Sequence, residues 1–256
     1  MNARLLVLPL LAAGAAIVAW QFAGTGPATA NTPAGTWRVG GDVDFTQGRN
    51  WDELPAESRL RLSWLAHGAS HCYVFSHSTT DGTLLLWPVP ELRSDLPTPL
   101  PDTPVVLPGK RGDRELAWTT RSQVLPATTY VVVGAKTPVP ELEALLPKLR
   151  RWSTSVLPDG SMQVTRPGLE AGAAVAGAPG EGWPAPLLKQ AAEMLLAETI
   201  VNGPLHTLPG HDGVFVSVWN VKEKPGTAKV GEPGQPQLPD ALKALQGESK
   251  PPAEKR

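Results

Sequence analysis

Three histidines and the single cysteine of this chain lie close together, and these residue types could ligate a metal or pair as base and nucleophile. His67, His71 and His77 fall within eleven residues, with Cys72 between them. The segment around Cys72 has the pattern of a strand, whose neighbouring side chains point to opposite faces, so His71 is badly placed to pair with Cys72. On one strand, His71 and His77 lie about 20 Å apart, too far for shared zinc ligation. We expect a buried Cys72, surface or strand-end histidines and no metal site.

The other patterns that could do chemistry are incomplete. Two serines flank His77, but the sequence has no Gly-x-Ser-x-Gly elbow. Asp42 and Asp44 would share a strand face and resemble a weak cation site, although acids in loops are usually solvated. The glycines between residues 168 and 182 fit neither the phosphate-loop nor the dinucleotide spacing. The sequence therefore assigns no catalytic residue, no cofactor and no metal ligand.

Tryptophan is unusually frequent, with nine Trp against two Tyr. Most of the tryptophans lie in or beside segments with a strand pattern, so we expect most of them in the core. An exposed tryptophan would mark a contact with a protein or a glycan, because a bulky apolar side chain is otherwise buried.

The first thirty residues have the form of an export signal. Arg4 is the only charged side chain among them, and residues 5–20 are almost continuously apolar. The tripeptide Ala28-Thr29-Ala30 has the small-x-small form that signal peptidase reads. We expect either a signal peptide cleaved after Ala30 or an uncleaved anchor that holds residues 5–23 in a membrane. Both predict a periplasmic or cell-envelope location, with the protein secreted or anchored in the inner membrane.

Charge and composition limit the classes of partner that the residues after the export segment could bind. Beyond Arg4 the chain carries 22 of its 23 basic residues and all 24 acidic ones. This near-balance provides no basic footprint for nucleic acid and no polybasic patch for anionic lipid. The 28 prolines predict many loops and few long helices. We therefore expect no nucleic-acid partner, and an envelope protein is the partner class that remains.

Hydrophobic periodicity predicts an α+β fold, mainly an antiparallel β-sheet with one or two packed helices. Alternation and β-branched runs predict the strands, and an Asp81-Gly82 turn predicts a tight hairpin. A 3.6-residue period predicts a first helix that Pro147 should kink or split, and a second helix that begins at Pro186. The expected strands are 59–64, 71–76, 83–87, 103–108, 115–120, 128–134, 156–164 (a hairpin) and 213–219, and the expected helices are 140–152 and 186–198.

The order of these segments resembles a known family. An alternating charged strand, an aromatic strand, an Asp-Gly turn with a Leu-Leu-Leu-Trp-Pro strand, and a Tyr-Val-Val-Val strand before a helix follow one another over roughly residues 58–150. This resembles a bacterial envelope domain of unknown function, often attached behind a membrane anchor in regulator-like proteins. The family usually has Phe-Pro where this chain has Trp87-Pro88. The zinc-binding segment of anti-sigma regulators is absent, and the resemblance implies no catalytic residues.

These observations divide the chain and define the expected function. We expect a non-enzymatic binding or sensory module of the envelope. An exported enzyme of the hydrolase type and an accessory subunit of an envelope assembly stay open as alternatives. The segments are 1–30 (signal peptide or anchor), 31–57 (leader), 58–152 (β-rich domain with a C-terminal helix), 153–221 (a second α+β segment, separate or part of the same domain) and 222–256 (a disordered, Pro-rich tail).

Overall fold

The computed structural model describes residues 32–40, 45–55, 58–120, 127–151, 153–156, 162–165, 182–195 and 201–223. All of these residues belong to one compact unit. The expected export segment, most of the glycine-rich loop and residues 224–256 of the expected tail lie outside the described residues. No helix in the described ranges has the length and apolar character needed to cross a membrane.

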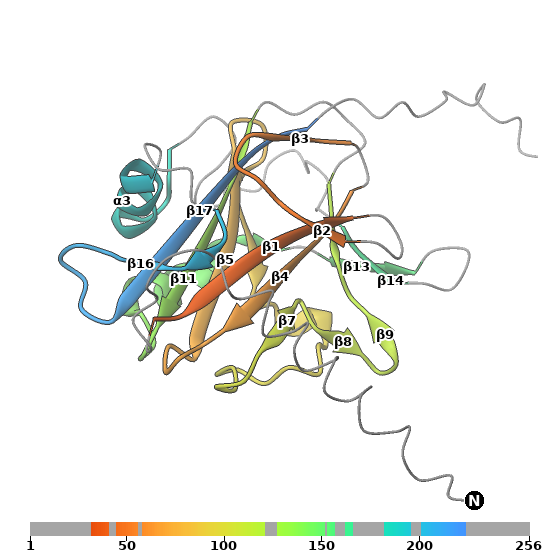
Figure 1. Ribbon diagram of the computed structural model, residues 1–256, viewed down its shortest axis with the longest axis horizontal. Coiled ribbons are helices and arrows are strands. Elements are labelled where there is room, and N and C mark those ends of the chain that lie inside the picture. The colour runs from red at the N-terminus through yellow and green to blue at the C-terminus, as the bar shows by residue number, and fades with distance from the viewer. Residues whose placement is uncertain are drawn as a thin grey trace, which may run out of the picture. The chain divides into compact units, whose positions relative to one another are not determined.

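Most strands belong to two large sheets (Figure 1). Sheet A has the order β13-β14-β10-β4-β1-β15, with β2 beside β1 and β7 beside β4. Its strands are β1 (Ala34–Gly40), β2 (Phe45–Gln47), β4 (Arg59–Leu65), β7 (Val105–Leu107), β10 (Trp118–Thr119), β13 (Ser153–Val156), β14 (Met162–Thr165) and β15 (Gly203–Pro204).

Sheet B has the order β12-β6-β5-β11-β17-β16, with β3 beside β17. Most neighbouring strands of both sheets are antiparallel, which confirms the expected β-rich α+β class. The strands of sheet B are β3 (Asp52–Leu54), β5 (His71–Ser78), β6 (Gly82–Trp87), β11 (Thr128–Ala135), β12 (Arg150–Arg151), β16 (His206–Thr207) and β17 (Val214–Glu223).

An aromatic cluster joins the two sheets. The Trp37 ring of sheet A lies 5.1 Å from the Trp219 ring and 5.2 Å from the Tyr130 ring of sheet B, between ring centroids. Trp118 of sheet A is 5.9 Å from Trp37, and all four side chains are fully buried. These rings belong to one continuous core, so the inner faces of the two sheets pack on each other. The expected burial of most tryptophans is confirmed here.

Two short helices pack on sheet B. Helix α3 (Pro186–Leu195) contacts β11 and β17 and lies beside them in Figure 1. Helix α2 (Pro140–Leu145) is tied to β5, because the Tyr73 hydroxyl donates to Glu143 Oε1 at 2.6 Å. The expected central position of residues 128–134 is confirmed, since β11 lies between β5 and β17 and is largely buried.

The expected helix 140–152 was too long. Helix α2 ends at Leu145, one 3₁₀ turn (η2, Leu146–Lys148) follows, and Arg150–Arg151 form strand β12. Pro147 causes the break. Its ring clashes with the carbonyl group four residues earlier in a helix, and it has no backbone N–H to donate. The predicted interruption at Pro147 is thereby confirmed.

The expected leader, residues 31–57, needs correction because it contains β1, β2 and β3. Strand β1 pairs with β4 over its full length and contributes the buried Trp37. Glycines at positions 35, 40 and 41 dilute the strand pattern of this segment, which explains why the sequence did not predict it. At the other end, β17 runs to Glu223, two residues into the expected tail. Since β17 is also an inner strand of sheet B, residues 153–221 contribute to the same two sheets.

Candidate functional site

A pocket of about 430 Å³ lies on the outer face of sheet A. Its floor takes residues from four adjacent strands, which are β2, β1, β4 and β7 in spatial order. Its walls come from the hairpin β8–β9 (Lys110–Arg111 and Arg114–Glu115) and from the loop before β7. The lining residues are Arg38, Phe45, Arg61, Asp95, Leu96, Pro104, Val105, Val106, Gly109, Lys110, Glu115 and Leu116.

Strand register places two arginines side by side at this floor. Arg38 of β1 lies directly opposite Arg61 of β4 in the antiparallel ladder, so their side chains leave the same face. The neighbouring pair, Trp37 and Leu62, points to the core and is fully buried. Alternation therefore fixes both arginines on the outer face. Like charges directly opposite each other repel, and an anion between them removes that repulsion.

Arg61 is a largely buried arginine. Its side chain is 16% exposed, and its guanidinium carbon lies 4.3 Å from the centroid of the Phe45 ring. This is a cation–π contact, which attracts the guanidinium to the aromatic face. The buried Nε of Arg61 has no hydrogen-bond partner in the described part of the chain. Arg61 therefore keeps unused donor capacity beneath the pocket.

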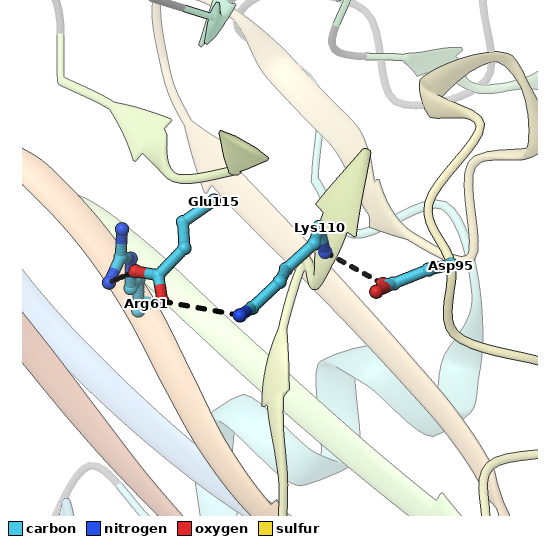
Figure 2. A network of polar contacts seen from close by, with 4 residues as sticks. All are labelled: Arg61, Asp95, Lys110 and Glu115. Atoms are coloured by element: carbon cyan, nitrogen blue, oxygen red, sulfur yellow. Dashed lines mark hydrogen bonds and ion pairs between the residues drawn. The ribbon is translucent and has the colours of Figure 1, made fainter. Parts of the chain in front are cut away.

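The hairpin supplies one carboxylate to this cationic floor (Figure 2). Glu115 Oε2 lies 2.5 Å from Arg61 Nη1, and Glu115 Oε1 lies 3.9 Å from Lys110 Nζ. Asp95 fixes the hairpin from the other side, because its Oδ1 accepts from Lys110 N at 2.8 Å and its own N–H donates to Lys110 O at 2.8 Å. Glu115 thus occupies part of the site that an external anion would use.

Arg38 has no carboxylate partner of this kind in the part of the chain that the structure describes. No described carboxylate lies within ion-pair distance of its guanidinium. The rest of the pocket wall is mainly apolar, from Leu96, Pro104, Val106 and Leu116. The pocket therefore combines two adjacent guanidinium groups with an apolar surround. This arrangement can bind a carboxylate, sulfate or phosphate group that is attached to an apolar body.

The histidines and the cysteine do not converge. Cys72 is buried on the inner face of β5, where burial raises the pKa of its thiol. His71 pairs with Ala135 and Cys72 with Gly134, so the two side chains lie on opposite faces, as expected. His67 lies in a turn with φ of 44°. Within the described ranges, no group of three or more metal-ligating side chains gathers.

His77 has a structural environment of its own. Its ring stacks on Trp183, which precedes α3, with centroids 4.4 Å apart. Its Nδ1 lies 2.8 Å from Thr83 Oγ1, and burial lowers the pKa of the imidazole. This contact ties the start of α3 to β5 rather than forming a catalytic pair with the flanking serines.

Sequence reasoning missed the residues of this pocket. Arg38 and Phe45 lay in the expected leader, while Lys110 and Glu115 lay in segments without a functional pattern. One signal was present, because the alternation of residues 59–64 places Arg61 on the solvent face of its strand. That pattern does not reveal Arg38 as its neighbour, since only strand register does.

Comparison with known proteins gives this site no precedent. No family model, no curated protein and no solved structure matches the chain. The resemblance of residues 58–150 to an envelope domain therefore stays a prediction, and the function must be argued from the chemistry of the pocket.

Proposed function

We propose that this protein is a non-enzymatic binding module of the cell envelope whose sheet A pocket takes a small anion with an apolar body. One observation carries the proposal. Arg38 and Arg61 stand opposite each other at the pocket floor, and Glu115 is the one described carboxylate that pairs with either of them. A bound anion satisfies both guanidinium groups at once.

The energetics favour an anion. A hydrogen bond that involves a charged group contributes about 1.5–3 kcal/mol, because the charge strengthens the electrostatic attraction. Arginine adds geometric selectivity, since its planar fork matches carboxylate and phosphate oxygens in pairs. The Arg61 side chain is only 16% exposed, and its limited contact with water increases the gain. The volume of about 430 Å³ lies within the range of small-molecule sites.

Binding is favoured over catalysis by where the chemically distinctive groups lie. Three described side chains have clearly shifted pKa values: burial raises those of Cys72 and Tyr73 and lowers that of His77. All three belong to β5 of sheet B, and none lines the pocket. The described lining contains no His, Cys or Ser, and its other candidate bases, Asp95, Lys110 and Glu115, are engaged with one another or with Arg61.

The envelope location rests on the form of residues 1–30. A cleaved signal or an uncleaved anchor would both place the pocket outside the cytoplasm. Intact-mass measurement of the exported protein tests this part of the proposal. A mass that corresponds to a chain beginning at Asn31 supports a cleaved signal. Retention of residues 1–30 in a membrane fraction supports an anchor. A full-length protein in the cytosol contradicts both.

Isothermal titration of the full chain tests the pocket. The ligands are phenyl phosphate and benzoate, with benzyl alcohol as the uncharged probe of similar shape. We expect the two anions to bind and benzyl alcohol to bind at least tenfold more weakly. Replacing Arg38 or Arg61 by Gln should raise the Kd for the anions by about tenfold or more, because each removes a charge-assisted hydrogen bond.

Arg114→Gln is the matched control, because Arg114 is an exposed hairpin arginine outside the pocket lining. It removes the same charge from the protein without changing the floor. An equal rise in the Kd for the anions in Arg38→Gln and Arg114→Gln would show that net charge alone attracts the anion. The proposed site would then be wrong. Absence of binding by every anion would contradict the proposal directly.

A further inference from the structure

Trp51 is an exception among the tryptophans that the structure describes. It is 46% exposed and lies in the turn between β2 and β3. Almost half of the surface of this side chain is therefore accessible to a ligand. The described tryptophans at most 3% exposed are Trp37, Trp64, Trp87, Trp118 and Trp219.

The backbone of Trp51 adopts a conformation that this residue type avoids. Its φ is 65°, in the left-handed region, where a bulky side chain crowds the backbone. Such outliers persist only where surrounding contacts fix them, and they gather at ligand-binding sites. Here the N–H of Trp51 donates to Asn220 O at 2.6 Å, and the N–H of Arg49 donates to Asp52 Oδ2 at 2.6 Å. The N–H of Asp52 donates back to Arg49 O at 3.1 Å and closes the turn.

Two buried residues of β17 hold the same turn in place. Trp219 Nε1 donates to Arg49 O at 2.8 Å, and the backbone N–H of Asn220 donates to Asn50 Oδ1 at 2.9 Å. Gly48 packs so closely that a Cβ there would lie 2.8 Å from the Trp219 ring. The turn is therefore held rigid before any ligand arrives, which removes most of the ordering cost of binding.

The residues next to Trp51 in this turn carry polar side chains. Arg49 is exposed and offers guanidinium donors, while Asn50 and Asp52 are partly exposed. The Asn50 amide nitrogen and Asp52 Oδ1 take part in no hydrogen bond within the described chain. The turn thus carries hydrogen-bond donors and acceptors beside one exposed aromatic side chain in the sequence.

This combination favours a sugar over a protein partner. A protein hot spot needs a ring of apolar contacts that excludes water. In the sequence from Arg49 to Glu53, Trp51 is the only apolar side chain. A pyranose ring instead presents C–H groups to an aromatic face and hydroxyl groups at its rim, and these match the indole and its polar neighbours.

We propose that the turn of residues 49–52 is a carbohydrate-binding platform, in which the Trp51 indole stacks on a pyranose ring and Arg49, Asn50 and Asp52 bind its hydroxyl groups. The platform is built on the edge where β2 passes to β3, whereas the anion pocket lies on the outer face of sheet A. The two proposals rest on different residues and can fail separately.

Titration of the full chain with soluble hexasaccharides tests the platform. The probes are β-1,4-linked glucose and β-1,4-linked N-acetylglucosamine hexamers, with binding followed by tryptophan fluorescence and by calorimetry. We expect at least one hexamer to bind, Trp51→Ala to weaken it by at least tenfold and Trp51→Phe to weaken it less, because Phe keeps an aromatic face.

Trp183→Phe is the control, since it changes another partly exposed tryptophan that stacks on His77. Circular dichroism of Trp51→Ala checks that the fold is retained, and Trp51→Phe keeps the test decisive if that variant unfolds. Failure of both hexamers to bind overturns the proposal. So does binding that Trp51→Ala leaves unchanged, or Trp51-dependent association with a protein in the absence of any sugar binding.

Discussion

Replacing Glu115 by Gln should tighten the binding of an anion in the sheet A pocket. In the free protein the Glu115 carboxylate lies 2.5 Å from Arg61 Nη1 and so occupies the guanidinium that a ligand needs. An incoming anion must share Arg61 with this carboxylate or displace it. Gln keeps the size of the side chain and removes the charge, so the variant isolates the electrostatic competition.

The size of the expected change in Kd follows from how exposed the Glu115 side chain is. Two like charges about 4 Å apart repel by about 1 kcal/mol in water and about 4 kcal/mol near a protein surface. The Glu115 side chain is 52% exposed, so the lower part of that range applies. A change of about 1–1.4 kcal/mol corresponds to roughly a five- to tenfold lower Kd. The cost in folding stability should stay within about 1 kcal/mol, because exposed ion pairs contribute little.

Calorimetric titration with phenyl phosphate measures the change in Kd, and urea unfolding measures the stability. Glu91→Gln is the matched control, because Glu91 pairs with Arg151 away from the pocket lining. It removes the same charge and also breaks an exposed ion pair. Unchanged or weaker anion binding by Glu115→Gln would refute the competition for Arg61. An equal decrease in Kd in both variants would show that only the net charge of the protein matters.

Two further predictions concern stability. Burial lowers the pKa of His77, so the unfolded state binds a proton more readily and the folded state loses stability as the pH falls through about 6.5. Between about pH 7.5 and 5, urea unfolding of His77→Gln should depend less on pH than that of a His211→Gln control, and equal slopes would contradict this. A Cβ at Gly134 would lie 2.6 Å from Trp64 Cη2, so Gly134→Ala should cost about 1–3 kcal/mol in urea unfolding. A Cβ at Gly35 would lie 3.4 Å from its nearest neighbour, so Gly35→Ala should lower the free energy of unfolding by less. The reverse order would contradict the close packing of Gly134 on Trp64.

The local pattern of the sequence was sufficient for several elements. Residues 59–64 alternate polar and apolar, and the observed β4 buries Leu60 and Leu62 while Arg61 faces outward. The Asp81-Gly82 turn and its flanking strands form the predicted hairpin. The helix from Pro186 also forms, because its apolar stripe and its proline at the first turn are local signals.

The strand β1 shows where local patterns stop. Glycines interrupt its alternation, and the segment forms a strand because β4 pairs with all of it and Trp37 enters a core shared with sheet B. Those interactions come from residues far away in the sequence. A reading of residues 34–40 alone contains no information about them.

The candidate site has the same origin. Sequence by itself determined that Arg61 lies on a solvent-facing strand position, that Cys72 and His71 point to opposite faces, and that few tryptophans could be exposed. Only the tertiary structure decided that Arg38 stands opposite Arg61, that Glu115 reaches Arg61 from a hairpin, and that Trp51 is the exposed indole. The physical reason is that side-chain alternation is local along one strand, whereas register and sheet packing are set by contacts between distant segments.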